Sequence, residues 1–309
     1  FGKLNNVLWF HFLALLINCF LLVDQVARCV PSLCFMMDDL LVQNSLMSKI
    51  ENSYSEIRNE EDIKKQSKHL KNLILSGDIS KSTALEIASY LKKQNTQYVS
   101  IRSSAELEGS YKASFAGMFD TYLNIESDID SVLDLTKKCW ASVFNENTLV
   151  YQFRMGVMSL VGIAVIIQEM IPSEISGVVR TVHPLDSSSL VIEMSYGIGD
   201  IIVKGLVQPD TYVVERNTLR ILEKIISNKN IMSICKGTGL EIIEVHNELA
   251  KKQAITDKVI RDVARTCLMV EKVFGYPQNI EVCIFNDKIW LLQSRPVVGG
   301  KNEDKNYSI

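Results

Sequence analysis

The hydrophobic pattern changes period along the chain, and this change restricts the possible folds more than any other feature. Over residues 55–95 and 127–144, apolar residues recur at the three- and four-residue spacing of amphipathic helices. From residue 162 onward, β-rich runs separated by Pro, Gly and Ser dominate, interrupted by one helical pattern at 256–274. Helices followed by a sheet-rich half predict an α+β fold with two lobes.

We place the first lobe at residues 1–147, with a strand and a lid loop at 98–125, and the second lobe at 148–300. The polar tail, residues 301–309, is expected to fray. We interpret residues 145–151 as a hinge, because the letters NENT separate a helical pattern from a β-rich one.

Local signals mark several element ends. Gly77 is a stop signal for the preceding helix, and Thr83 with Glu86 has the spacing of a capping box that opens the next one. Asn286–Asp287 separates two β-rich runs and predicts a tight hairpin turn.

Composition narrows the classes of partner. The 309 residues are 47% hydrophobic and 22% charged, with a net charge of -3, which argues against general nucleic-acid binding. A few placed cations must therefore hold any anionic ligand. Seven cysteines without a CxxC pair and only four histidines argue against a zinc site. Reduced, buried thiols in a cytoplasmic protein are the simpler interpretation.

Residues 4–23 carry no Asp, Glu, Lys or Arg, and their length approaches that of a membrane span or a signal-peptide core. His11 and Asn18 interrupt the apolar run, and Lys3 alone precedes it as a basic residue. We favour a buried or irregular segment of the fold and expect no membrane association. A membrane or targeting segment, or a stretch foreign to this fold, are the alternatives.

Arg102 ends a short apolar strand and is followed by a loop rich in small residues up to Gly117. A guanidinium offers a fork of donors to a phosphate, and backbone N–H groups of such a loop can surround phosphate oxygens. An arginine paired with Glu106 or Glu108 at the edge of the core explains the same letters equally well.

The two closing β-rich runs carry Glu281 on one side of the turn and Gln293 and Arg295 on the other. The offsets from the turn predict that Glu281 and Gln293 lie close together on adjacent strands, with oxygen ligands that suit Mg²⁺. Arg295, two residues on, shares the face of Gln293. A salt-bridged structural hairpin is the alternative. His183, at the end of another run, is more typical of a packing or hydrogen-bonding residue than of a catalytic one.

Six ordered motifs resemble a known family. The letters RSSAELEGSYKASFAGMFDTYLNI, CWASVF, IIQEMIPSEISGVVRTVHP, EMSYGIGDIIVKGLVQPDTYVVER, GYPQNIEVCIF and WLLQSRPV occur in that order. They are similar to the ATP-binding domain of the phosphoenolpyruvate synthase and pyruvate phosphate dikinase family. The short segment between TVHP and EMSYG favours its rifampicin phosphotransferase branch.

The resemblance implies an ATP-grasp fold in which two lobes clamp ATP and Mg²⁺. It implies a domain that cleaves ATP to AMP and phosphate and passes the β-phosphoryl group to a histidine on a separate swivelling domain. That carrier domain, in a longer chain or in a second one, would deliver the group to pyruvate or to a rifampicin-like antibiotic. No phosphohistidine motif occurs in the 309 residues.

The resemblance also assigns roles to residues. It implies phosphate contacts for Lys3, Arg102 and Arg295, which would supply the catalytic cations. It places Gly117 and Thr121 in the loop that covers the nucleotide, Gln168 at the adenine hinge, and Glu281 and Gln293 on the metal. Together the implied nucleotide-binding residues are Lys3, Arg102, Gly117, Thr121, Gln168, Glu281, Gln293 and Arg295.

The chain departs from the family pattern at several positions. Gly109 and Tyr111 alter the lid, His183 and Asn279 stand where acids are usual, and Val282 replaces an aromatic residue. These replacements motivate an alternative hypothesis, a degenerate ATP-binding module without catalytic activity.

Overall fold

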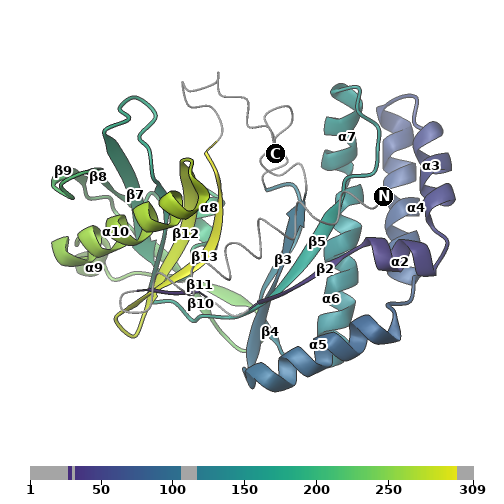
Figure 1. The fold of residues 1–309 in the computed structure, drawn as a ribbon, viewed down its shortest axis with the longest axis horizontal. Coiled ribbons are helices and arrows are strands. Elements are labelled where there is room, and N and C mark those ends of the chain that lie inside the picture. Colours follow the sequence, from purple (N-terminus) through teal and green to yellow (C-terminus); the bar gives the residue numbers. More distant parts are fainter. Residues whose placement is uncertain (1–26, 30–31, 106–116, 298–309) are drawn as a thin grey trace. The chain divides into compact units, whose positions relative to one another are not determined.

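The computed structural model describes residues 27–29, 32–105 and 117–297, which fall into two compact units (Figure 1). Of the described residues, the helix-rich unit comprises 32–105, 117–170 and Gly237–Gly239. The sheet-rich unit comprises residues 27–29, Ile171–Lys236 and 240–297.

The helix-rich unit extends beyond residue 147, where we expected a boundary. Strand β5 (Ile163–Glu169) pairs with both β2 (Ser32–Met36) and β3 (Tyr98–Ala105), so it belongs to the sheet of this unit. We predicted a hinge between a helix and a strand at residues 145–151. This is wrong, because most of these residues lie in helix α7 (Glu146–Arg154).

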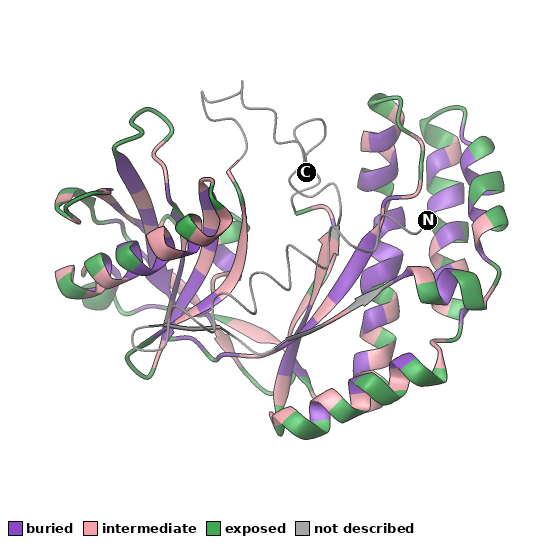
Figure 2. Ribbon diagram, in the orientation of Figure 1, coloured by how far each residue is buried: buried purple, intermediate pink, exposed green. Residues whose placement is uncertain are grey.

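The four strands of the helix-rich unit are antiparallel and follow the order β2-β5-β3-β4, with β4 at Thr121–Glu126. Helix α6 (Ile129–Ala141) contacts β3, β4 and β5, and Figure 2 shows buried residues along it. Its Trp140 is buried in the core of the unit. The other helical elements are α2 (Asp38–Gln43), α3 (Met47–Ser55), α4 (Glu60–Ser76), α5 (Lys81–Gln94) and the 3-10 turn η1 (Ser142–Phe144).

Side-chain caps fix the starts of α4, α5 and α6. Asn59 accepts hydrogen bonds from two backbone N–H groups at the start of α4, and Asp128 accepts one from Ser131 at the start of α6. The predicted capping box at Thr83 is wrong. Ser80 is the N-cap of α5 and accepts from the Thr83 N–H group, which places Thr83 inside the first turn, where it is buried.

The sheet-rich unit is built on seven strands in the order β1-β13-β12-β6-β7-β8-β9. The strands are β1 (Ala27–Cys29), β6 (Ile175–Arg180), β7 (Ser189–Tyr196), β8 (Asp210–Glu215), β9 (Ile221–Ile225), β12 (Gln278–Phe285) and β13 (Lys288–Pro296). Only β1 pairs in parallel within this described sheet. Helix α10 (Asp257–Phe274) contacts β7, β8 and β12, as Figure 1 shows.

Alternation along the central strands separates the two faces of this sheet. Ile192, Tyr212 and Ile280 are fully or almost fully buried and belong to the core that includes α10. Their neighbours Glu193 and Glu281 are only partly buried. Because side chains alternate across a strand, the polar residues lie on the face opposite α10.

A second, two-stranded sheet joins β10 (Ile231–Cys235) and β11 (Leu240–Glu244), a pair that the sequence did not predict. Its turn, Gly237–Gly239, packs on β4 and counts with the helix-rich unit. Asn124 donates from Nδ2 to the Gly237 and Gly239 carbonyls at 2.7 and 2.8 Å. The Gly239 N–H group donates to the Asn124 carbonyl at 2.7 Å. Short helices α8 (Asp200–Val203) and α9 (Asn247–Ala250) complete the described elements.

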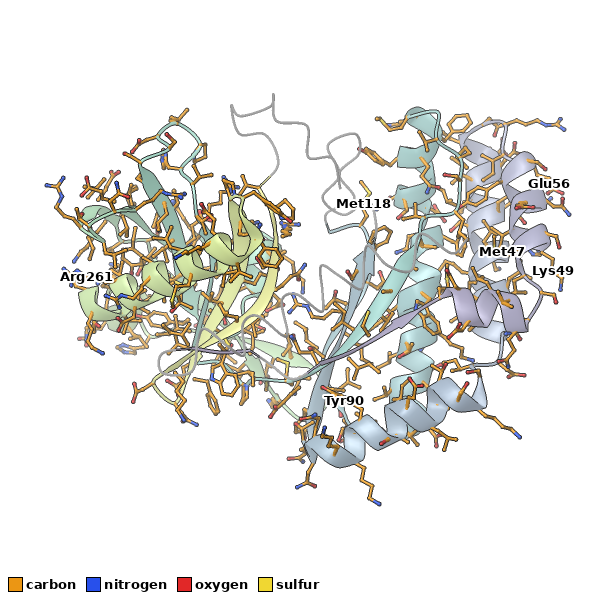
Figure 3. All side chains as sticks on the ribbon, in the orientation of Figure 1. Met47, Lys49, Glu56, Tyr90, Met118 and Arg261 are labelled. Atoms are coloured by element: carbon orange, nitrogen blue, oxygen red, sulfur yellow. The ribbon has the colours of Figure 1, made fainter. Side chains whose placement is uncertain are left out.

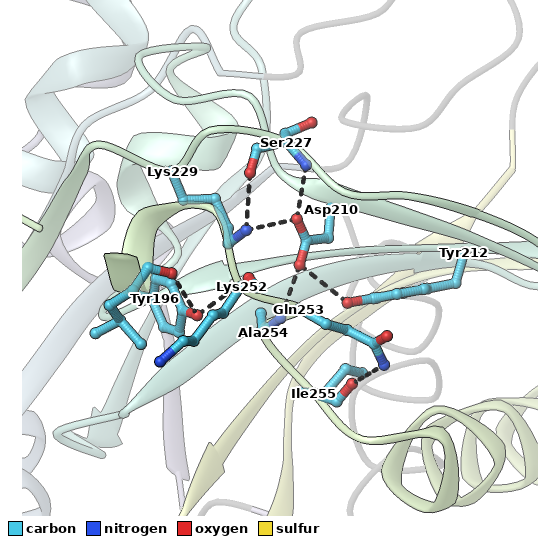
Figure 4. A network of polar contacts seen from close by, with 10 residues as sticks. Tyr196, Asp210, Tyr212, Ser227, Lys229, Lys252, Gln253, Ala254 and Ile255 are labelled. Atoms are coloured by element: carbon cyan, nitrogen blue, oxygen red, sulfur yellow. Dashed lines mark hydrogen bonds and ion pairs between the residues drawn. The ribbon is translucent and has the colours of Figure 1, made fainter. Parts of the chain in front are cut away.

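A buried ion pair lies inside the sheet-rich unit (Figure 4). The side chains of Asp210 and Lys229 both have no exposed surface. Asp210 Oδ1 accepts from Lys229 Nζ at 2.6 Å and from the Ser227 N–H group at 2.9 Å. Oδ2 accepts from the Tyr212 hydroxyl at 3.0 Å and the Ala254 N–H group at 2.7 Å. The carboxylate is therefore satisfied without water.

Within the part of the chain that the structure describes, no helix has both the length and the apolar composition that crossing a membrane requires. The apolar run at residues 4–23 and the tail at 301–309 lie outside the described residues.

Candidate functional site

The hairpin of β12 and β13 carries the first group of candidate residues. Asn286 and Asp287 form its two-residue turn, both with positive φ (51° and 57°), which confirms the predicted turn. A register shift between Glu281 and Val282 adds one residue on β13, so that Glu281 pairs directly with Gln293. Without this bulge, Leu292 would stand opposite Glu281 and the amide would face the other side of the sheet.

The donors of this pair fit a hard divalent cation. Glu281 and Gln293 occupy directly paired positions, whose Cβ atoms lie about 5 Å apart in antiparallel sheets. One carboxylate and one amide oxygen are ligands that Mg²⁺ accepts when phosphate oxygens and water complete its shell. No group of three or more His, Cys, Asp or Glu side chains suited to a metal occurs among the described residues.

Arg295 lies two pairs further along the hairpin, opposite Asn279. The amide of Asn279 fits its surroundings when its oxygen faces Arg295, where it accepts from Nη2 at 3.3 Å and from Nε at 3.2 Å. This neutral acceptor orients the guanidinium without cancelling its charge. Register places Arg295 on the same face as Glu281 and Gln293, beside a neutral side chain.

The helix-rich unit carries the second group. Arg102 on β3 pairs with Thr121 on β4 and with Ile166 on β5. Gln168, two residues beyond Ile166, pairs with Ser100 and is 5% exposed. Arg102, Thr121 and Gln168 therefore share one face of the four-stranded sheet, opposite the face on which Ile101 and Ile167 enter the core.

Cys34 extends this face of the sheet. It pairs with Ile166 on the strand next to β5. Burial raises the pKa of the Cys34 thiol to about 11, so the thiol stays protonated at neutral pH and is a poor nucleophile. Among the described residues the free cysteines are Cys34, Cys139, Cys235, Cys267 and Cys283, each buried or partly buried, as the sequence suggested.

Among residues 106–117, Gly117 is the predicted lid residue that the structure describes. Gly117 is the first described residue after 106–116 and has φ of 74°, a conformation that favours glycine. The lid residues Gly109 and Tyr111 lie outside the described residues, and so does Lys3. The phosphate contact assigned to Lys3, and the alteration of the lid by Gly109 and Tyr111, stay predictions.

His183 acts as a hydrogen-bonding residue in the turn between β6 and β7. Its ring Nδ1 accepts from the backbone N–H group of Leu185 at 3.1 Å. Its backbone N–H group donates to the Ser189 carbonyl at 2.9 Å. Asp186 in the same turn accepts from Ser188, and these hydrogen bonds hold the pKa of its carboxyl below the usual value. The histidine thus has a local structural role, as its lone position suggested.

The register adds two residues that sequence reasoning missed. Glu281 pairs with Val178 on β6, and Val178 pairs with Glu193 on β7, which places Glu193 in the same cross-strand line as Glu281 and Gln293. Asn279 pairs in the same way with Arg180. The signal for Glu193 was its position as a single acid within the apolar letters LVIEM, because an acid at an alternating site marks the polar face.

Comparison with known proteins identifies the family of this chain. Residues 35–308 match the model of the pyruvate phosphate dikinase AMP/ATP-binding domain. The chain belongs to this family. Its fold is of the ATP-grasp type, as the motifs predicted.

Phosphoenolpyruvate synthases and rifampicin phosphotransferases are relatives of this family member. The chain is 34% identical over 269 residues to phosphoenolpyruvate synthase of Pyrococcus furiosus, covering 81% of this chain and 33% of that protein. It is 36% identical over 236 residues to rifampicin phosphotransferase of Bacillus cereus, covering 75% of this chain and 27% of that protein. A probable phosphoenolpyruvate synthase of Methanocaldococcus jannaschii is 32% identical over 278 residues, covering 85% and 23%. The chain thus spans a quarter to a third of these relatives.

Proposed function

We propose that this chain is the ATP-using domain of a dikinase-type phosphotransferase. In this reaction ATP yields AMP and inorganic phosphate, and the β-phosphoryl group passes to a histidine on a separate swivelling domain. The carrier then delivers the group to its acceptor, for which the named relatives suggest pyruvate or a rifampicin-like antibiotic.

The single observation that carries the proposal is the common face of Glu281, Gln293 and Arg295 within a chain of this family. Phosphoryl transfer depends on positioning and on offsetting the roughly four negative charges of ATP more than on covalent catalysis. Glu281 and Gln293 would hold Mg²⁺, which would neutralise phosphate charge when bound. Arg295, oriented by Asn279, would donate to a phosphate oxygen.

The helix-rich unit would contribute the remaining contacts. Arg102 and Thr121 stand side by side on β3 and β4 and would bind phosphate beneath the lid, while Gln168 would face the adenine.

Titration calorimetry with ATP and Mg²⁺ tests the metal assignment. We expect Glu281→Gln to lose the Mg²⁺-dependent part of ATP affinity, because an amide replaces the only carboxylate of the proposed metal pair. Glu248→Gln, an exposed site on α9, makes the same charge change and should bind as the wild type does. Equal ATP affinity in wild type and Glu281→Gln would count against the proposal.

The degenerate-module alternative rests on the acids replaced by His183 and Asn279. Incubation with ATP labelled at the β-phosphate, Mg²⁺ and a separately expressed phosphohistidine domain separates the two functions. Labelled phosphohistidine supports the transferase. Nucleotide binding without any label on the carrier supports the binding module.

A further inference from the structure

We propose that Arg180 is a second phosphate-binding cation of the sheet-rich unit and acts together with Arg295. This inference deepens the proposed function and rests on it for the identity of the ligand. Neither the motif resemblance nor the family match assigns a role to Arg180, which sits in the letters GVVRT at the end of β6.

Strand register places the two arginines in one line across the sheet. Asn279 on β12 pairs with Arg295 on β13 and with Arg180 on β6. Directly paired residues point to the same side, so all three side chains lie on the face opposite α10. Two strand spacings of about 4.8 Å put the arginine Cα atoms roughly 10 Å apart. Two long guanidinium side chains can reach one phosphate group across that distance.

Arg295, Asn279 and Arg180 form one row of directly paired residues across the sheet, with positive charge. The next row on the same face has negative charge. It runs from Gln293 through Glu281 and Val178 to Glu193, and it contains two acids and no base. The first row contains two arginines and no acid. Positions two residues apart on a strand are about 6.7 Å apart, so a cationic row and an anionic row run side by side. A metal–polyphosphate ligand has the complementary arrangement, with its cation toward the acids and its phosphate oxygens toward the arginines.

Arg180 is exposed, and no other described residue forms a hydrogen bond or ion pair with its side chain. Glu281 and Glu193 are the diagonal neighbours of Arg180 on the two adjacent strands. Asn279 turns its oxygen toward Arg295, which leaves its Nδ2 group as a donor on its other side. An anion beside Arg180 would therefore meet the N–H donors of Arg180 and Asn279. The row formed by Arg295, Asn279 and Arg180 contains no acid.

Calorimetry with inorganic tripolyphosphate in EDTA, without metal, tests the inference directly. We expect Arg180→Gln to weaken tripolyphosphate binding about tenfold, because charge-assisted hydrogen bonds to the anion are lost. Arg180→Lys keeps the charge but not the fork and should lose about threefold. Arg261→Gln is the matched control, because Arg261 is exposed on α10, which packs on the opposite face (Figure 3). Its affinity should equal that of the wild type.

The outcomes separate this inference from the proposed function. Equal tripolyphosphate affinity in Arg180→Gln and Arg261→Gln overturns the inference, even if Mg²⁺-dependent ATP binding still requires Glu281. A tenfold loss in Arg180→Gln, together with ATP binding that ignores both Mg²⁺ and Glu281→Gln, supports the anion site and overturns the proposed function.

A third outcome would assign Arg180 to charge balance. If Arg180→Gln tightens Mn²⁺ binding and leaves tripolyphosphate binding unchanged, then Arg180 offsets the charge of Glu281 and Glu193, and the inference is wrong. Because Arg180 is exposed and forms no hydrogen bond or ion pair with other described residues, the variants should fold.

Discussion

Replacement of Lys229 by methionine should destabilise the sheet-rich unit by about 3–5 kcal/mol. Lys229 and Asp210 are both fully buried, and the methionine side chain has a similar volume, so the change leaves no large cavity. It removes the Nζ bond to Asp210 at 2.6 Å and the bond to the Ser227 carbonyl at 3.0 Å. The Asp210 carboxylate keeps its other hydrogen bonds but stays buried without a counter-ion. Breaking a buried ion pair in this way typically costs about 3–5 kcal/mol.

A second contribution comes from Tyr196. Lys229 Nζ lies 5.4 Å from the centroid of its ring, within the range of a cation–π contact. The Tyr196 hydroxyl also donates to the Leu249 and Lys252 carbonyls, so the network holds the segment that leads into α10 (Figure 4). We therefore expect hydrogen exchange in residues 249–255 to quicken in Lys229→Met before the whole unit opens.

Urea unfolding followed by circular dichroism measures the loss. With a slope of about 2 kcal/mol/M, a loss of about 4 kcal/mol lowers the midpoint of the unit by roughly 2 M. Lys224→Met is the control, because Lys224 pairs with Asp257 at a partly exposed site and should lose at most about 1 kcal/mol. If the two variants lose the same stability to within about 1 kcal/mol, the reasoning about the buried pair is refuted. A double variant, Lys229→Met with Asp210→Asn, should lose less than the sum of its parts.

Three further predictions concern single positions. Asn124→Ala should cost about 2–4 kcal/mol in urea unfolding, because it removes two hydrogen bonds and places alanine at φ of 57°; Asn124→Gly should cost less, and equal losses would contradict the backbone argument. Gly177→Ala should unfold the sheet or yield insoluble protein, because its Cβ would lie 2.1 Å from the Glu193 carbonyl oxygen; a soluble variant with wild-type melting would exclude this clash. Asp128→Ala should cost about 1 kcal/mol at neutral pH. Hydrogen bonds from Ser131 lower the pKa of the Asp128 carboxyl in the folded state. The stability that Asp128 contributes is therefore present above the ordinary pKa of about 3.9 and disappears as the pH falls through the lowered value. Thermal melts from pH 7 to pH 2 in which the stability difference between wild type and Asp128→Ala stays constant would contradict this.

The sequence predicted the local structure well where a pattern was long or a turn had special chemistry. Helix α10 follows Thr256 and ends at Phe274, as its apolar spacing indicated. The Asn286–Asp287 turn forms as expected, because both residues tolerate positive φ. The pattern failed at residues 145–151 and at Thr83, where helix and cap positions depend on neighbours that local propensity does not describe.

Part of the candidate site was predictable from the sequence. Glu281, Gln293 and Arg295 were assigned from offsets in a hairpin, and the register places them on one face. The line that joins Arg295 to Arg180 was not predictable, because β6 and β13 are far apart in the chain and meet only through β12.

The amino-acid sequence by itself determined the family, the order of helices and strands, and the alternation that separates a core face from a polar face. Tertiary structure decided which strands stand beside which, and the bulge at Leu292 decided that Gln293 faces Glu281. The physical reason is that side-chain alternation is a local property of each strand. Strand pairing and register depend instead on packing among residues that are distant in sequence.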